Sequence, residues 1–262
     1  MFEAIRRWRE RRILSSSAIP EALWREALEA LPFLAVYTEP ELQRLRERVV
    51  LFLNDKSIVG AEGFQVTPLM RAMIAIQACV LVLNLDQRLY DGWENVIVYP
   101  DEFVTNLEYE DEAGVVHRRA EPLAGEAMPG GPVVLSWPDI EASADWSAAG
   151  MNLVIHEFAH KIDMRNGEAN GFPPLPPEMP RRGWQKAMSD AYAHFRARVE
   201  KGDDTAIDPY ASESPAEFFA VLSEVFFADP TLLRMEYPKV YRLFTQLYRQ
   251  DPASRTELLL EH

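Results

Sequence analysis

The sequence has little cysteine and no long uncharged apolar run, and these absences argue against a disulfide-linked protein and against a membrane-spanning one. Cys79 is the single cysteine among 262 residues, so an intramolecular disulfide is excluded, as is typical of proteins from a reducing compartment. The best candidate for a membrane span, residues 69–83, is shorter than the roughly 20 apolar residues required and contains Arg71 and Gln77. We therefore expect a buried core helix there and no membrane partner.

Basic residues are also scarce. The 27 Lys and Arg residues face 41 Asp and Glu residues, which gives a formal net charge of −14. A surface this acidic repels phosphate backbones, so we expect no direct binding of nucleic acid. The one basic cluster, residues 6–12, is interrupted by Glu10 and is followed by no apolar run of the roughly 7 to 15 residues found in export signals. These features favour a solvated N-terminal end and a cytoplasmic protein.

A chain with 48% hydrophobic residues can bury a sizeable core, and its patterns are mostly helical. Short β-branched or aromatic runs bounded by Pro and Gly predict strands at residues 94–100 and 131–137. The acidic stretch 107–131 between them is a hairpin or a surface loop. Few short strands among many helices predict an α+β fold. The predicted helices cover residues 19–55 (two helices, broken at Leu31 and Pro32), 69–85, 152–164, 184–200, 214 onward and 238–250.

The segment from His156 to His160, with the sequence His-Glu-Phe-Ala-His, predicts a metal-bearing helix. Two histidines four positions apart lie on one face of a helix, about 6 Å apart along its axis, so their imidazoles can converge on one zinc ion. Glu157 is rotated by about 100 degrees from His156, which lets it act as a general base on a water molecule beside the metal. Two core histidines with ordinary hydrogen-bond partners are the alternative. Lys161, charged within this apolar helix, is expected to point to solvent or to an acid.

A catalytic zinc site takes three protein ligands and leaves one position open. His117, His194 and His262 lie in contexts that give no support for a ligand. Asp163 shares a helix face with His156 but lies about 10.5 Å farther along the axis. It is an acceptor for a ligand imidazole N–H or simply a charge near the helix end, and the sequence favours neither.

The helix from Ser214 onward is apolar on almost every face, so a carboxylate within it must be paired or bind metal. Glu217 is a candidate for the third ligand. However, Ser214 and Glu217 also form a capping-box pattern, with Pro215 at the first helical position, and ligand and cap are equally compatible with the residues alone. Glu224, seven positions on, is predicted to support a ligand or to form a buried salt bridge.

Four segments of the sequence resemble the Mlc titration factor A family of zinc-dependent peptidases. That family is similar, around its zinc, to the catalytic domain of anthrax lethal factor. There a Glu from an Ala-Glu-Phe-Phe segment joins the two histidines, and a Tyr lies seven residues before that Glu. The resemblance implies that Glu217 is the third zinc ligand and that Tyr210 stabilises the oxyanion. The segments are residues 132–137, 156–167, 170–176 and 210–224.

The resemblance also implies a fold, an activity and a partner. The implied fold is a single zincin-like catalytic domain over residues 1–262, with residues 1–90 as a mainly helical N-terminal portion and residues 91–262 as the zinc-bearing core. The implied activity is that of a cytoplasmic zinc metallopeptidase acting on peptide substrates in an aminopeptidase-like manner. The implied partner is the glucose-uptake repressor Mlc, which the family binds and titrates off DNA.

A non-catalytic protein that sequesters the repressor and keeps zinc as a structural element is the alternative. Glu157 argues against it, because a structural site closes its fourth position and needs no general base. For a peptide substrate, residues 133–137 are either an edge strand that pairs with the extended peptide or a strand that serves only the core.

Overall fold

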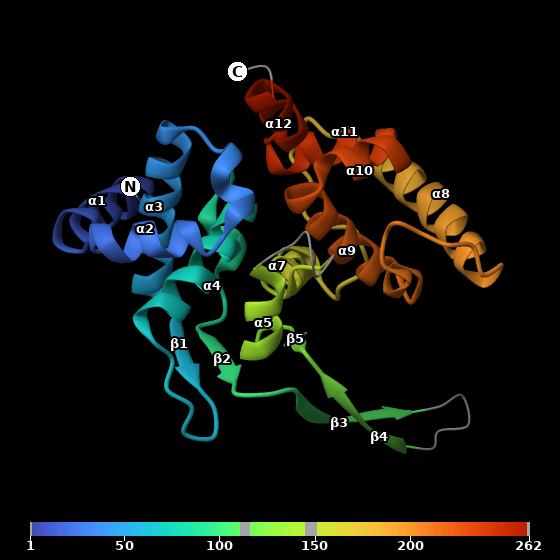
Figure 1. The fold of residues 1–262 in the computed structure, drawn as a ribbon, viewed down its shortest axis with the longest axis horizontal. Helices are drawn as coiled ribbons and strands as arrows, with labels where there is room; N and C mark the ends of the chain where they lie inside the picture. Colours follow the sequence, from blue (N-terminus) through green and yellow to red (C-terminus); the bar gives the residue numbers. More distant parts are fainter. Residues whose placement is uncertain (1, 111–115, 145–150, 261–262) are drawn as a thin grey trace.

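The computed structural model describes residues 2–110, 116–144 and 151–260, and it confirms the predicted α+β class. Figure 1 shows an N-terminal group of helices (blue) and a C-terminal group (orange to red) with α7 between them, and the strands below. α7, Leu153–Asp163, contains the His-Glu-Phe-Ala-His segment, and each of its residues is buried. This helix is therefore the element around which both groups pack.

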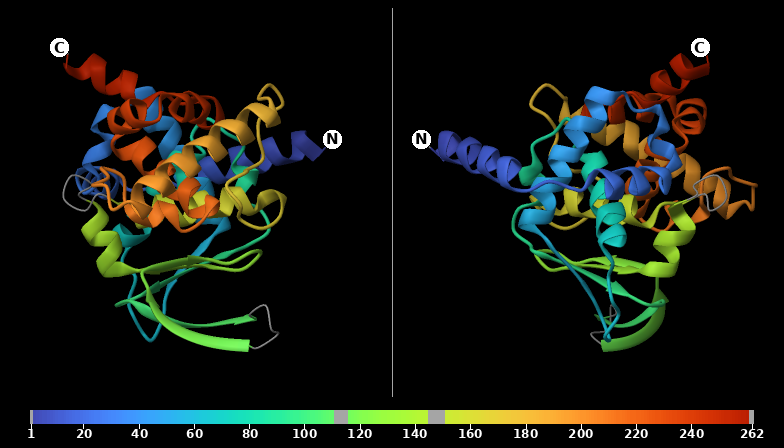
Figure 2. Two further views of the ribbon diagram at one scale, coloured as in Figure 1. Left: turned by 90° about the vertical axis from the view of Figure 1, so that its right-hand side faces the viewer. Right: turned by 60° about the vertical axis from the view of Figure 1, so that its left-hand side comes forward.

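The N-terminal portion is mainly helical, as predicted, and its break at Pro32 and restart after Thr38 are confirmed. Thr38 and Glu41 form a capping box at the start of α3, with Thr38 N donating to Glu41 Oε2 at 3.0 Å. The sequence does not predict α1, which projects from the other helices in Figure 2 and is tied by Arg6 to Asp86 at 3.4 Å. The elements, where η marks a 3-10 helix, are α1 (Phe2–Ser16), α2 (Glu21–Glu29), η1 (Pro32–Val36), α3 (Glu39–Asp55), β1 (Ser57–Gly60), α4 (Pro68–Leu81) and η2 (Gln87–Tyr90).

The central sheet has four strands in the order β1-β2-β6-β5. β1, β2 and β6 are parallel, whereas β5 pairs antiparallel with β6. β6 therefore lies inside the sheet with all four residues buried, so the edge-strand alternative for residues 133–137 is wrong and β5 forms the edge. A hairpin is confirmed within residues 107–131, because β3 pairs antiparallel with β4. The strands are β2 (Asn95–Tyr99), β3 (Phe103–Glu110), β4 (Val116–Leu123), β5 (Gly125–Ala127) and β6 (Val133–Ser136).

The apolar helix predicted at residues 69–85 is α4, which packs against α7. Cys79 within it is fully buried, and burial raises the pKa of its thiol, which disfavours the reactive thiolate. On α7, Phe158 packs against Phe52 and Tyr90 with ring centroids 5.7 and 5.2 Å away. In the described part of the chain, no helix combines the length and the apolar character that crossing a membrane requires.

Prolines set the starts of the C-terminal helices. Pro215, Pro230, Pro238 and Pro252 each occupy the first position of a helix, where no hydrogen bond is lost and the φ angle is already helical. The remaining elements are α5 (Trp137–Ala144), η3 (Met164–Asn166), α8 (Arg181–Glu200), η4 (Pro209–Ser212), α9 (Pro215–Ala228), α10 (Pro230–Glu236), α11 (Pro238–Tyr248) and α12 (Pro252–Leu260). Of these, the sequence does not predict α5 and α12.

Candidate metal centre

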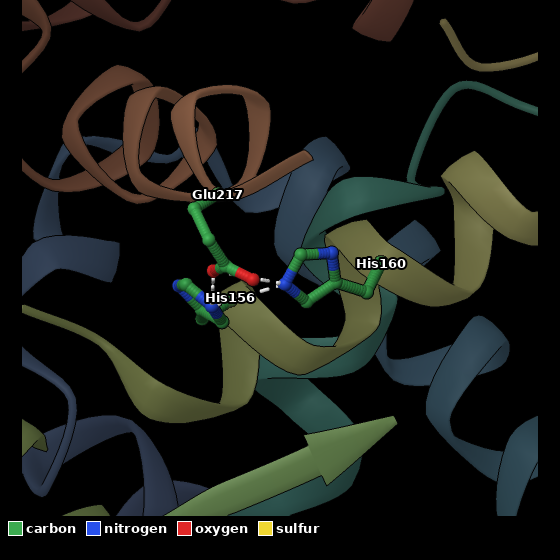
Figure 3. Close-up of side chains that lie close together, drawn as sticks. All are labelled: His156, His160 and Glu217. Carbon is green, nitrogen blue, oxygen red and sulfur yellow. Dashed lines mark hydrogen bonds and ion pairs between the residues drawn. The ribbon is translucent and has the colours of Figure 1, made fainter. Parts of the chain in front are cut away.

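Two helices supply the side chains of the candidate metal centre. α7 follows its cap residue Asn152, whose Oδ1 accepts a hydrogen bond from Ile155 N at 2.9 Å. α9 follows Ser214, whose Oγ accepts from Glu217 N at 3.1 Å. The two helices pack against each other, so the first turn of α9 lies over the middle of α7 (Figure 3).

The structure brings His156, His160 and Glu217 together. The Nε2 atoms of the two histidines are 3.1 Å apart, and Glu217 Oε2 lies 2.9 Å from His156 Nε2 and 3.3 Å from His160 Nε2. Figure 3 shows the carboxylate extending from α9 onto the two imidazoles of α7. Among the described residues, these three form the one group whose ligand atoms all lie within 4.8 Å of one another.

Glu217 uses its backbone and its side chain for different purposes. Its N–H completes the cap with Ser214, while its carboxylate contacts the imidazoles. Only half of the predicted capping box is therefore formed. The carboxylate is available to a metal ion, so cap and ligand are compatible with each other and not alternatives.

Glu224 holds His156 from the side opposite to the cluster. Its Oε1 lies 2.6 Å from His156 Nδ1, and its Oε2 accepts from Asn152 N at 2.5 Å. An ionised carboxylate can only accept, so Nδ1 carries a proton and Nε2 is the ring nitrogen that faces Glu217. This contact serves both predicted uses of Glu224, because it supports a candidate ligand and, when His156 is protonated, is also a buried salt bridge.

The donor set fits a divalent metal ion. With the proton of His156 on Nδ1, His156 Nε2 and Glu217 Oε2 are two acceptors only 2.9 Å apart, which is unfavourable unless a cation or a proton lies between them. Two imidazole nitrogens and one carboxylate oxygen are also the ligands typical of catalytic zinc sites. His156, His160 and Glu217 would hold the ion.

Glu157 and Tyr210 line a cavity beside the cluster, with a volume of about 220 Å³. Glu157 is 5% exposed, whereas Tyr210, on η4, is 50% exposed. The Tyr210 ring lies 6.1 Å from the His156 ring, centroid to centroid. The cavity is also lined by Met151 and Asp208, which the sequence gave no reason to select.

The pKa values of Glu157 and Glu217 are shifted in opposite directions. Burial raises the pKa of Glu157, although the neighbouring imidazoles oppose this, and a raised pKa makes the carboxylate a stronger base. Burial alone would also raise the pKa of Glu217, but hydrogen bonds with His156 and His160 outweigh it and hold that pKa far below its usual range. Glu217 therefore stays ionised, as a metal ligand has to, whereas burial raises the pKa of Glu157 and also that of Glu224, which is hydrogen bonded to His156.

Asp163 does not accept a hydrogen bond from an imidazole, so that predicted role is wrong. Its Oδ2 accepts from Asn170 N at 2.6 Å and Gly171 N at 2.7 Å, and no described atom is a hydrogen-bond partner of His160 Nδ1. The loop that Asp163 holds lies on the start of α9, because a Cβ at Gly171 would come within 2.4 Å of Pro215 O. Asp163 thus fixes the loop that packs against the start of α9.

The expectation for Lys161 is also wrong, because it points neither to solvent nor to an acid. It is 3% exposed, and its Nζ donates to the backbone carbonyls of Met128 and Gly131. Burial and the nearby Lys56 lower the pKa of Lys161 to about 8. Two backbone carbonyls, and not solvent or an acid, therefore hold the ammonium group of Lys161 in place.

The other histidines lie apart from the cluster or outside the described part of the chain. His194, on α8, has its Nδ1 3.1 Å from the hydroxyl of Tyr237. The side chain of His117 and all of His262 fall outside what the structure describes. Nothing in the described residues adds a third histidine or a cysteine to the group.

Comparisons with known proteins agree with a metal centre here. Residues 5–249 match the family described as Glucose-regulated metallo-peptidase M90. The chain belongs to this family. Three relatives carry the name Mlc titration factor A: the protein from Yersinia enterocolitica is 42% identical over 237 residues (89% of this chain, 87% of the relative). That from Klebsiella pneumoniae is 40% identical over 237 residues (90% and 88%), and that from Escherichia coli is 39% identical over 250 residues (95% and 92%).

Family membership confirms the predicted resemblance and assigns the chain to the metallopeptidases. A metallopeptidase family implies a divalent metal, and the group of His156, His160 and Glu217 is compatible with one. The match covers both the N-terminal helices and the residues of the site.

Proposed function

We propose that the chain is a zinc-dependent peptidase in which His156, His160 and Glu217 are the ligands and Glu157 is the general base. The observation that carries this proposal is the convergence of the three ligand atoms within 4.8 Å, next to a cavity lined by a buried carboxylate of raised pKa. A structural zinc site would have no use for that carboxylate.

Zinc, when bound, supplies a Lewis acid that polarises a peptide carbonyl and lowers the pKa of a nearby water. Glu157 takes the proton from the attacking water and passes it to the leaving amine. Tyr210 donates a hydrogen bond from its hydroxyl group to the carbonyl oxygen that gains negative charge, a role supported by its place on the cavity wall. Glu224 keeps the His156 ring and its tautomer fixed.

The edge strand β5 and the cavity suit an extended peptide. β5 borders the cavity at Gly125, and none of the described strands pairs with its outer side, so a peptide can add to it by backbone hydrogen bonds. The cavity then takes the side chain next to the bond that is cleaved. Asp208 on its wall supplies a negative charge for a free α-amino group, which supports the aminopeptidase-like activity that the family resemblance implies.

The regulatory part of the proposal rests on the relatives. They are named Mlc titration factor A, and we infer from this that the chain binds a repressor of the Mlc type in the cytoplasm. The sequestering protein without catalysis is the competing function. The same relatives support this competing function, but it gives no role to Glu157 or Tyr210.

A peptidase assay with and without a chelator tests the proposal. The substrates are internally quenched peptides, which report cleavage within a chain, and amino-acid anilides, which report removal of an N-terminal residue. We expect hydrolysis of the anilides that is lost with chelator and restored by zinc. Hydrolysis that persists in chelator would overturn the zinc-dependent mechanism, whereas the absence of hydrolysis in zinc-loaded protein would favour the sequestering function.

A further inference from the structure

A stripe of α7 that carries no metal ligand faces the hairpin formed by β5 and β6. Leu153, Glu157 and Lys161 are spaced by four positions, so they lie on one face of the helix, rotated by about 100 degrees from His156. Leu153 and Glu157 lie against Gly125, and Lys161 contacts the turn that joins the two strands. α7 therefore presents its histidines to α9 and this second stripe to the hairpin.

Lys161 binds the turn through its ammonium group. Nζ donates to Met128 O at 2.6 Å and to Gly131 O at 2.7 Å, and it lies 4.8 Å from the ring centroid of Trp93. Met128 O also accepts from Gly131 N at 3.0 Å, so the turn closes on itself and is fixed to the helix at the same atom. A buried ammonium is unfavourable unless such acceptors are held in place, which makes the contact specific.

At its other end, the hairpin rests on Glu157. A Cβ built at Gly125 would lie 2.5 Å from Glu157 Oε1 and 2.7 Å from Leu153 Cδ1, closer than real Cβ atoms approach other atoms. A side chain at this position would therefore displace the Glu157 carboxylate or the end of Leu153, because the backbone of β5 lies directly against both. The strand therefore limits where the Glu157 carboxylate can lie.

From these contacts we propose that Lys161 is a positioning residue for Glu157. Lys161 fixes the turn on α7, the turn fixes β5, and β5 confines the carboxylate. The catalytic consequence rests on the proposed function, in which Glu157 is the base. The structural part, that Lys161 holds the hairpin, is independent of hydrolysis.

The first experiment tests the structural part by hydrogen exchange. Lys161→Met keeps an unbranched stem of similar length but cannot donate to two carbonyls. Lys56→Met is the matched control, because Lys56 is also buried, lies 4.5 Å from the Trp93 centroid and donates to Trp93 O at 2.6 Å, not to the turn. We expect amides of residues 125–136 to exchange about tenfold faster in Lys161→Met and no faster in Lys56→Met.

Zinc affinity, measured by competition against a chelator, should stay close to that of the parent in Lys161→Met, because the ligands lie on the other stripe. Unchanged exchange in residues 125–136 would overturn the proposal whether or not the chain is a peptidase. An equal increase in Lys56→Met would do the same, since the effect would then come from lost packing around Trp93.

The second experiment tests the effect on Glu157 in zinc-saturated protein. Lys161→Met should lower kcat by roughly 10- to 100-fold, the scale for a small misplacement of a catalytic group, with a smaller change in KM. Lys161→Arg, which keeps donors, should restore part of the loss. Gly125→Ala should lower kcat comparably, and the double variant should lose less than the product of the two, because both changes displace one carboxylate.

Losses that multiply in the double variant would show independent effects and would overturn the positioning role. If the parent itself hydrolyses neither anilides nor quenched peptides, the proposed function fails, and the exchange experiment still decides whether Lys161 holds the hairpin.

Discussion

α7 and α9 are both apolar, buried helices that begin at a side-chain cap, yet they use their charged residues differently. α7 places two histidines and Glu157 within five residues, so a single turn carries both candidate ligands and the base. α9 carries two carboxylates seven positions apart, and both act on His156, Glu217 at Nε2 and Glu224 at Nδ1. α7 supplies the groups that would react, and α9 fixes their charge state and orientation.

The difference explains why one helix is easier to recognise than the other. The pattern on α7 has no common structural cause, whereas each carboxylate of α9 has an ordinary one. Glu217 fits a cap and Glu224 fits a buried ion pair. The role of α9, whose carboxylates contact a histidine on α7, can therefore be identified only from the structure in which the two helices pack together.

The largest effect is expected on α7 itself. Glu157→Gln should lower hydrolysis by roughly 10² to 10⁴, the range for losing a general base, and should keep about one zinc per chain. His156→Ala is the companion variant and should lose the metal as well, because it removes a ligand. Metal content by elemental analysis and turnover of an anilide are the measurements. Undiminished cleavage by Glu157→Gln would rule out Glu157 as the general base.

On α9, Glu217→Gln should weaken zinc binding by more than the roughly 10- to 100-fold expected for a residue that only supports a ligand. The amide is a poor neutral donor, whereas the half cap with Ser214 uses the backbone N–H and survives the change. Competition against a chelator measures the affinity. Asp163→Asn is the control, since Asp163 holds the loop at Asn170 and forms no hydrogen bond with an imidazole in the described structure. A larger loss in Asp163→Asn would contradict the assignment of Glu217 as a ligand.

Tyr210 precedes α9, and its hydroxyl is proposed to act on the substrate and not on the metal. Tyr210→Phe should lower turnover by roughly 10² to 10³, the range for losing one donor to an oxyanion. Zinc content and the melting temperature should not change, because the side chain is half exposed. Steady-state kinetics on the anilide check this, and an unchanged kcat would make Tyr210 a surface aromatic without a catalytic role.

Glu224→Gln sharpens the contrast between the two carboxylates of α9. The amide keeps the shape of the side chain but weakens its hold on His156 Nδ1, so zinc affinity should fall by roughly 10- to 100-fold, less than for Glu217→Gln. The same chelator competition gives the comparison. If Glu224→Gln is the more damaging of the two, the orientation of His156 matters more than the third ligand.

The smallest effect is expected at the caps. Ser214→Ala removes the acceptor for Glu217 N and should lower the free energy of unfolding by about 1 kcal/mol. Asn152→Ala should cost more, because it also leaves the buried Gln77 amide without its partner at 2.6 Å. Urea denaturation in the presence of chelator measures both without a contribution from metal. Equal losses would mean that Asn152 is no more than a cap.

The fold class, the long helices and the central pattern of α7 could be predicted from the sequence because each follows from local periodicity, capping and turn residues. Pro32, Thr38 and Pro215 mark their boundaries by rules that involve only neighbouring residues. Strand β1 is missing from the prediction, because four residues between a helix and a glycine carry too weak a pattern. The edge role was assigned to the wrong strand, since residues 133–137 carry a strand pattern and Gly125–Ala127 carries none.

The parts of the site that the sequence could not supply depend on distant contacts. Nothing near Asp163 indicates that its carboxylate accepts from two amides of the following loop. Lys161 was expected to need solvent or an acid, and the carbonyls of a turn some 30 positions earlier take that place. Gly125 has no local mark at all, because its close contact is with Glu157 on α7, some 30 positions later.

Asn152 joins three helices that are far apart in the chain. Its side-chain amide donates to Gln77 of α4, 75 positions earlier, and its N–H donates to Glu224 of α9, 72 positions later. Contacts of such long range form late, because closing long loops costs chain entropy before the contact stabilises anything. A growing polypeptide that has completed α7 has both histidines but lacks Glu217 and Glu224. A metal ion met during synthesis would be held by fewer ligands until α9 is added, so binding by all three proposed ligands requires a chain that extends through α9.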